Sequence, residues 1–141
     1  MYESILFPTD GSEGAAGAFD HAIDLAATFD ASLSVLFVAD TSRESVTMVE
    51  GEVVDALEAE GEEAIADLVD RAQGRGVEAA GEVVQGPPYR TILDYAETRD
   101  VDVIVMPTHG REGLDRYLLG SVTERVVRTS SVPVLTVHRE D

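Results

Sequence analysis

The sequence predicts one α/β domain, residues 1–141, built on a doubly wound parallel sheet of five strands in the order 3-2-1-4-5 with helices on both faces. The first observation is the length, because 141 residues fit one compact domain. The second is that short apolar runs alternate with helical patterns from end to end. The third is that two runs, 33–38 and 103–106, are almost entirely apolar, as in strands covered on both faces.

The first βα unit is expected near the amino terminus. A strand at 5–7 is followed by a turn at 8–12, where Asp10 or Ser12 can cap the next helix. The second strand is expected at 33–38. Helical spacing between the two strands gives one apolar face to Ala18, Ala22, Leu25 and Phe29.

A long amphipathic helix and an edge strand are expected next. The helix ends at Gly74 and Gly76, because glycine favours helix termination. The strand at 77–83 alternates apolar residues with Glu78 and Glu82, which indicates a position at the edge of the sheet. The apolar stripe of the helix consists of Val54, Leu57, Gly61, Ile65, Leu68 and Ala72, and its opposite face carries Asp55, Glu58, Glu62 and Glu63.

The last two units follow a turn at Gly86-Pro87-Pro88, where proline suits the start of a helix. The fourth strand is expected at 103–106, followed by a loop at 107–119 and a helix at 121–128. The final strand is expected at 134–138. The apolar face of the helix after the turn consists of Ile92, Leu93 and Ala96.

The strand order follows from the charge on the third strand. A flavodoxin-like order would bury this strand in the centre, whereas Glu78 and Glu82 favour the edge and therefore the order 3-2-1-4-5. In that order the first and fourth strands flank the topological switch point, beyond whose carboxyl ends ligands bind. Two loops are therefore expected to form the site, 8–12 and 107–121.

The composition is strongly acidic. The net charge is −18, and all basic residues are arginine, because the chain has no lysine. This balance is typical of the hydrated surface of a halophile protein, and a cationic partner is the alternative. Nucleic acid is disfavoured, because phosphate binding favours a basic face. Cysteine is absent, and no apolar run approaches membrane-spanning length, so we expect a cytoplasmic protein without disulfides or membrane contact.

One loop carries the pattern of an anion site. Thr108-His109-Gly110 is followed, after nine residues, by Gly120-Ser121-Val122-Thr123 at a helix start. Glycine lets backbone N–H groups approach phosphate closely, and a helix start supplies free donors and partial positive charge. Ser121 and Thr123 add hydroxyl donors. The same stretch concentrates Arg111, Arg116, Arg125 and Arg128.

A purely structural interpretation of these residues stays open. Ser121 and Glu124 fit a capping box, in which the side chains satisfy the amides of their own helix. The arginines can pair with neighbouring carboxylates, which contributes only about 0 to 1 kcal/mol per exposed pair. This interpretation accounts for the helix start but not for a glycine-bracketed loop at the switch point.

On these residues the chain resembles the universal stress protein family. The resemblance runs from Pro8-Thr9-Asp10-Gly11-Ser12 through Gly110 and Gly120-Ser121 to Pro133-Val134-Leu135, over essentially the whole chain. Nucleotide-binding members carry Gly, two residues, Gly, nine residues, then Gly followed by Ser or Thr. Gly110 and Gly120-Ser121 match the last two parts, but Pro107 replaces the first glycine and removes an N–H donor.

The resemblance implies a Rossmann-like fold of the adenine nucleotide alpha hydrolase type. It also implies ATP, ADP or AMP as the ligand, with Mg²⁺ held mainly by the phosphates. Asp10 would lie near the ribose or the metal, and Val38 and Met106 would line the adenine side; helix capping and core packing are the respective alternatives. The expected binding residues are Pro8, Thr9, Asp10, Gly11, Ser12, Val38, Met106, Pro107, His109, Gly110, Arg111, Gly120, Ser121, Val122 and Thr123.

Other chemistry finds little support in the sequence. The histidines, His21, His109 and His138, lack metal-ligand spacing. A Walker A motif is impossible without lysine, and the spacing of Gly11, Gly14 and Gly17 is not a dinucleotide fingerprint, so we interpret it as close packing of helix on strand. We expect neither catalytic residues nor a protein-held metal, and at most slow ATP hydrolysis.

Three functions follow, in order of preference. The first is a nucleotide-binding stress-response or signalling module. The second is a nucleotide-free interaction module of the same fold, which Pro107 favours. The third is a slow phosphohydrolase that uses Asp10 and His109. A homodimer is also expected through the last strand, 134–138, because it is apolar on both faces yet lies at a predicted edge, and the resemblance implies that two such strands pair.

Overall fold

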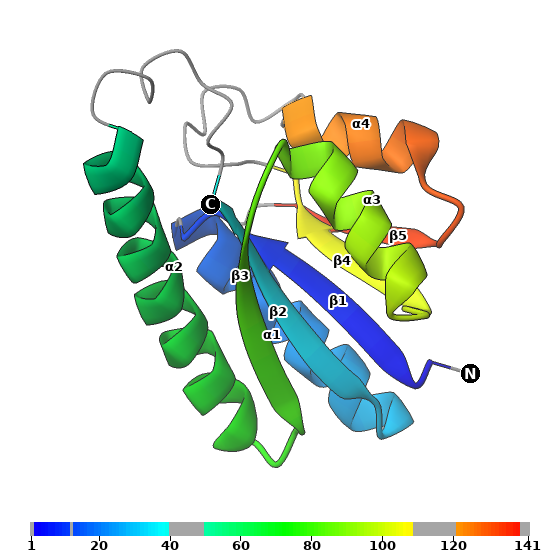
Figure 1. The fold of residues 1–141 in the computed structure, drawn as a ribbon. Coiled ribbons are helices and arrows are strands. Elements are labelled where there is room, and N and C mark those ends of the chain that lie inside the picture. Colours follow the sequence, from blue (N-terminus) through cyan, green and yellow to red (C-terminus); the bar gives the residue numbers. More distant parts are fainter. Residues whose placement is uncertain (1, 12, 40–49, 109–120, 139–141) are drawn as a thin grey trace.

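The computed structural model describes residues 2–11, 13–39, 50–108 and 121–138. Within these ranges strands and helices alternate along the chain (Figure 1). The strands are β1 (Ser4–Thr9), β2 (Ser32–Ala39), β3 (Ala79–Gln85), β4 (Val103–Pro107) and β5 (Val134–Val137). The helices are α1 (Glu13–Phe29), α2 (Glu50–Gln73), α3 (Pro88–Thr98) and α4 (Ser121–Thr129).

All neighbouring strands of the sheet are parallel, and their order is β3-β2-β1-β4-β5. The predicted fold class and strand order are therefore confirmed. Glu78 and Glu82 did mark an edge strand: β3 lies at one edge of the sheet, and Glu82 is exposed. β1 and β4 lie side by side in the middle of the order, as a switch point between the first and fourth strands requires.

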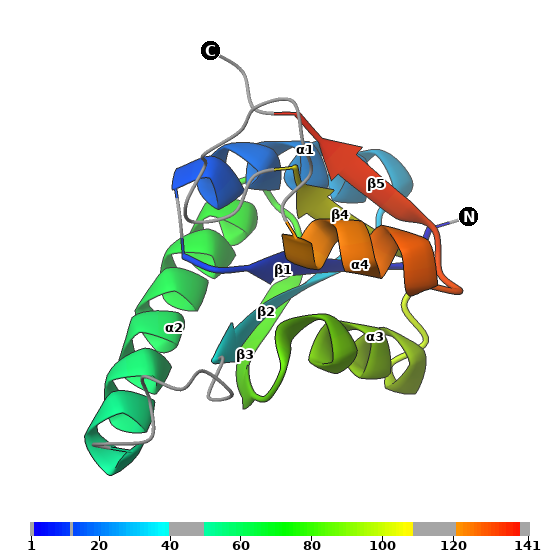
Figure 2. The same cartoon turned by 90° about the horizontal axis from the view of Figure 1, so that it is seen from above.

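Helices cover both faces of the sheet, because strand side chains alternate between two apolar clusters. One cluster joins α1 and α2 to strand residues such as Phe7 and Val35. The other joins α3 and α4 to residues such as Leu6 and Leu36. Figure 2 shows α1 and α3 on opposite sides of the strands. In the described residues, none of the helices combines the length and the apolar character that a membrane span needs.

The predicted element boundaries hold with a few corrections. β1 continues through Pro8 and Thr9, which we had expected in the turn, because parallel pairing with β2 extends to Thr9 and Phe37. β3 runs from Ala79 to Gln85 rather than over 77–83. β4 includes Pro107, and β5 ends at Val137, one residue before His138.

Two expectations for α1 were wrong. Phe29 was expected on the buried face, but it is 40% exposed and makes an edge-to-face contact with Tyr2, with ring centroids 5.1 Å apart. Gly17 was expected to allow close packing, but a Cβ atom placed there would meet nothing within 4 Å. The rest of the predicted face is correct, because Ala18 and Ala22 are buried.

Candidate functional site

The two central strands separate toward their carboxyl ends. β1 stays paired with β2 as far as Thr9, and β4 stays paired with β5 as far as Pro107. Between β1 and β4, however, the paired register ends at Leu6 and Ile104. We call the ends of β1 and β4 beyond this pair the seam. The seam lies at the predicted switch point, where an α/β sheet offers space for a ligand.

A proline on each side of the seam limits strand pairing there. Pro8 and Pro107 have no N–H group to donate to a ladder. Ile104 and Thr108 both donate their N–H groups toward the β5 side, Ile104 to the carbonyl of Pro133 just before β5 and Thr108 to that of Val137. Because successive residues of a strand direct their backbone groups to opposite sides, position 107 faces β1 across the seam. The donor that Pro107 lacks is therefore one that would have pointed into the seam.

The first turn of α4 is anchored at this point. The Thr123 hydroxyl donates a 2.9 Å hydrogen bond to the Pro107 carbonyl, and Thr123 is only 5% exposed. Ser121, two residues earlier, is exposed at the helix start. The free amides and the partial positive charge of a helix amino terminus thus lie beside the end of β4. Such an end suits a negatively charged group.

The β1 side of the seam ends in a tight turn. Thr9 is buried, and its Oγ1 accepts a 3.0 Å hydrogen bond from the N–H of Gly11. Gly11 has φ of 81°, a conformation that glycine adopts without the strain that a side chain would cause. Asp10 lies between them and is half-buried. The turn therefore brings a carboxylate and a glycine with positive φ to the end of β1.

Comparison with known proteins decides the family. The model of the universal stress protein family matches residues 1–138. The chain belongs to this family. Universal stress protein MJ0531 of Methanocaldococcus jannaschii is 39% identical, with 99% of this chain and 84% of that protein covered. Universal stress protein YxiE of Bacillus subtilis is 31% identical, over 98% of this chain and all of that protein.

Solved structures agree with this assignment. The structure of hypothetical protein MJ0577 superposes with a TM-score of 0.89 at 34% identity, covering all of this chain and 99% of that one. A universal stress protein in complex with cAMP superposes with a TM-score of 0.76 at 26% identity, covering 99% of both chains. The fold of this universal stress protein is therefore that of its family, and one relative of the same fold was solved with an adenine nucleotide.

The structure brings together only part of the predicted binding set. Pro8, Thr9, Asp10 and Gly11 form the β1 side of the seam, and Pro107 with α4 forms the other side. Ser12, His109, Gly110, Arg111 and Gly120 lie outside the described residues. Thr123, which was expected to offer its hydroxyl to phosphate, donates it to Pro107 instead. That contact joins residues 16 positions apart, and no local sequence pattern predicts it.

The residues expected on the adenine side differ in accessibility. Val38 is half-buried near the end of β2 and packs against the α3–α4 cluster. Met106 is only 4% exposed and belongs to the core of that cluster. Val122 is half-buried against the same cluster. The side chain of Met106 therefore has the core-packing role that the sequence left open, whereas Val38 keeps surface for another contact.

Two arginines near the site have local partners, as the structural interpretation allows. The Arg125 guanidinium carbon lies 4.1 Å from the ring centroid of Tyr89, on α3. Arg128 forms a 2.8 Å ion pair with Glu124 one turn earlier. Among the described residues, no group of three or more His, Cys, Asp or Glu side chains could hold a metal ion.

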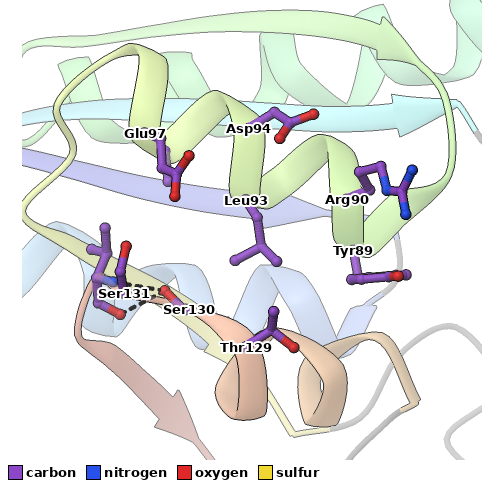
Figure 3. Close-up of a pocket in the computed structure, with 10 residues that line it drawn as sticks. Tyr89, Arg90, Leu93, Asp94, Glu97, Thr129, Ser130 and Ser131 are labelled. Carbon is purple, nitrogen blue, oxygen red and sulfur yellow. Dashed lines mark hydrogen bonds between the residues drawn. The ribbon is translucent and has the colours of Figure 1, made fainter.

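A groove lies at the other end of α4, away from the seam. It has a volume of about 290 Å³ and lies between α3 and the connection from α4 to β5. Figure 3 shows Leu93 and Glu97 pointing from α3 toward this connection. The hydroxyl of Ser130 is engaged in its own turn, donating to the carbonyl of Val132 and accepting from its N–H. The groove is thus separate from the residues that form the seam.

The shifted pKa values also lie outside the seam. Burial raises the pKa of Tyr95 on α3, where Arg99 opposes the shift and Glu82 adds to it. The amides of Glu3 and Ser4 lower the pKa of Asp102 at the amino end of β4. Both groups belong to contacts between secondary-structure elements.

Proposed function

We propose that this chain binds an adenine nucleotide at the seam and serves as a stress-response or signalling module. The observation that carries the proposal is the separation of β1 and β4 beyond Leu6 and Ile104, with the amino end of α4 tied to the same place by Thr123. An anion fits that helix end, and a sugar or base fits beside the Asp10 turn and Val38. The relative solved with cAMP supports an adenine nucleotide as the ligand.

The proposed binding set follows from this arrangement. Asp10 and Gly11 contact the ribose or the metal, Val38 lines the adenine side, and Ser121 contacts a phosphate. His109, Gly110, Arg111 and Gly120 complete the phosphate side in the proposal. Mg²⁺ comes with the nucleotide and is held mainly by phosphate oxygens, in line with its preference for octahedral oxygen ligands and retained waters.

Isothermal titration with ATP, ADP and AMP at high salt tests the proposal directly. For the wild-type protein we expect a heat of binding that saturates at nucleotide concentrations below 1 mM, on the order of ordinary ligand affinities. Ser121→Asp places a negative charge at the helix start and should abolish binding, because like charges repel in a partly desolvated site. Ser131→Asp is the matched control, since it adds the same charge at an exposed position beyond the other end of α4. Equal loss in both variants would show that overall charge, and not the seam, governs binding.

The alternative function is a nucleotide-free interaction module. Pro107 favours it, because this residue removes the N–H that the family's first glycine would supply. The same titration separates the two functions. Absence of heat at millimolar concentration for all three nucleotides, with folded protein, would support the alternative.

We also propose that the protein forms a homodimer through β5. This strand lies at the edge of the sheet, and Leu135 is 43% exposed there. An edge strand leaves unpaired N–H and C=O groups that a second strand can satisfy. Pairing of two β5 strands would also remove the Leu135 side chain from water.

A further inference from the structure

We infer that Thr123 is a positioning residue, whose hydroxyl holds the amino end of α4 at the seam and does not itself bind phosphate. The inference rests on the proposed nucleotide site. It assigns Thr123 a role different from that of Ser121, although both are hydroxyl residues in the same turn. Ser121 is exposed, whereas Thr123 is buried.

The hydrogen-bond inventory of a hydroxyl supports this role. Threonine has one O–H donor and two acceptor lone pairs. The donor of Thr123 is used by the Pro107 carbonyl at 2.9 Å. What remains on this oxygen are lone pairs, which repel phosphate oxygens. The Thr123 side chain therefore has no donor left to offer an anion while this bond is made.

The Pro107 carbonyl needs this partner because of its place in the sheet. The backbone groups of residue 107 face the seam, where β1 no longer pairs with β4. A half-buried carbonyl without a partner costs free energy, so a donor from α4 stabilises this end of the strand. The same bond fixes the first turn of α4 relative to β4. Any amide of that turn that meets a phosphate thus has its position set through Thr123.

The remainder of α4 is held by other contacts. Val126 is fully buried in the α3–α4 cluster, and Arg125 stacks on Tyr89. Loss of the Thr123 hydroxyl should therefore loosen the first turn without detaching the helix. Thr123→Val keeps the shape of the side chain and removes only the hydroxyl. Thr123→Ser keeps the hydroxyl and removes only a methyl group.

Thr129→Val is the matched control. It makes the same chemical change in the same helix, at an exposed position near the other end. Two measurements are needed on wild type and all three variants. The first is the nucleotide dissociation constant from titration with ADP. The second is hydrogen exchange, in nucleotide-free protein, of amides 125–127, which close the first turn of an α-helix.

We expect Thr123→Val to weaken ADP binding about tenfold and to speed exchange of amides 125–127 about tenfold before any nucleotide is added. Thr123→Ser should restore both, and Thr129→Val should change neither. Weaker binding with unchanged exchange would identify Thr123 as a phosphate ligand and overturn the inference. Unchanged exchange and unchanged binding would overturn it as well. If wild type binds no nucleotide, the proposed function fails, while the exchange data still test the tie between α4 and β4.

Discussion

Gly61 of α2 lies directly against the ring of Phe37 in β2. A Cβ atom placed on Gly61 would come within 2.5 Å of the Phe37 Cδ1 atom, closer than real Cβ contacts allow. Phe37 is buried between α2 and the sheet, so its ring has little room to move. We therefore expect Gly61→Ala to lower the free energy of unfolding by about 1 to 3 kcal/mol, although alanine is the better helix former. Urea denaturation measures this change.

Gly17→Ala is the matched control and should have the opposite sign. Gly17 also lies within a helix, but an added Cβ atom meets nothing within 4 Å. Only the helix propensity remains, so the free energy of unfolding should rise by about 0.5 to 1 kcal/mol. Equal effects of the two substitutions would show that contact with Phe37 does not decide the outcome at Gly61.

The sequence predicted the arrangement of the sheet because that information is local. Two nearby glutamates, Glu82 within β3 and Glu78 just before it, were enough to assign β3 to an edge, and the apolar runs identified the central strands. Phe29 shows where periodicity stops being informative, because helical spacing gives a face but not the point at which α1 passes beyond the sheet. There Phe29 meets Tyr2 instead of the core.

The candidate site was predicted in location but not in detail. The strand order alone indicated the seam, since it follows from topology. The bond from Thr123 to Pro107 joins residues 16 positions apart, and it depends on how the end of β4 separates from β1. Neither residue type carries a signal for such a contact. The pattern at the helix start therefore suggested that the Thr123 hydroxyl binds phosphate, whereas in the structure this hydroxyl connects α4 to β4 through a hydrogen bond.

Asp102 links stability to pH at the start of β1. Its Oδ2 atom accepts hydrogen bonds from the amides of Glu3, at 2.8 Å, and Ser4, at 3.0 Å. These donors hold the pKa of the carboxyl below its ordinary value of 3.8. Because the folded pKa is the lower one, the stabilisation is fully present above the unfolded value and is lost as the pH falls through the folded value.

We therefore expect Asp102→Asn to destabilise the protein near neutral pH and to differ little from wild type in strong acid. Urea denaturation at about pH 7 and about pH 2.5 measures the difference. Asp100→Asn is the control, because it removes a neighbouring charge at a position with φ of 51°, which asparagine tolerates. A gap between Asp102→Asn and wild type that stays constant with pH would contradict the linkage.

Salt should stabilise this protein. Asp20 of α1 pairs with Arg71 of α2 at 3.4 Å, and Asp24 of α1 pairs with Arg75 in the turn after α2 at 2.7 Å; salt weakens such exposed pairs. Each contributes only about 0 to 1 kcal/mol, whereas a net charge of −18 causes repulsion over the whole surface. We expect the screening of this repulsion to outweigh the weakening of the ion pairs. The urea concentration at the unfolding midpoint should therefore rise between about 0.1 M and about 2 M KCl.

A charge-reduced variant tests the cause of this salt effect. Replacement of four exposed α2 carboxylates by amides removes negative charge from positions without ion-pair partners in the described part of the chain: Glu62, Glu63, Asp67 and Asp70. Its midpoint should rise less steeply with KCl than that of wild type. A midpoint that falls with salt in wild type would mean that the ion pairs outweigh the repulsion.

The proposed dimer depends on an apolar residue on β5, which is an edge strand among the residues that the structure describes. Leu135 is one of the large apolar side chains left exposed in the described residues, and it lies on β5. Leu135→Glu would add a like charge to each of the two strands that pair in the proposed dimer, and repulsion between them opposes the pairing. We expect wild type to scatter light with twice the mass of the chain at micromolar concentration and high salt, and Leu135→Glu to scatter as a monomer.

Ala80→Glu, at an exposed position of the opposite edge strand β3, adds the same charge and should remain a dimer. If the wild-type protein is a monomer, the proposed dimer is wrong. If only the Ala80→Glu variant dissociates, the dimer interface lies at β3 and not at β5.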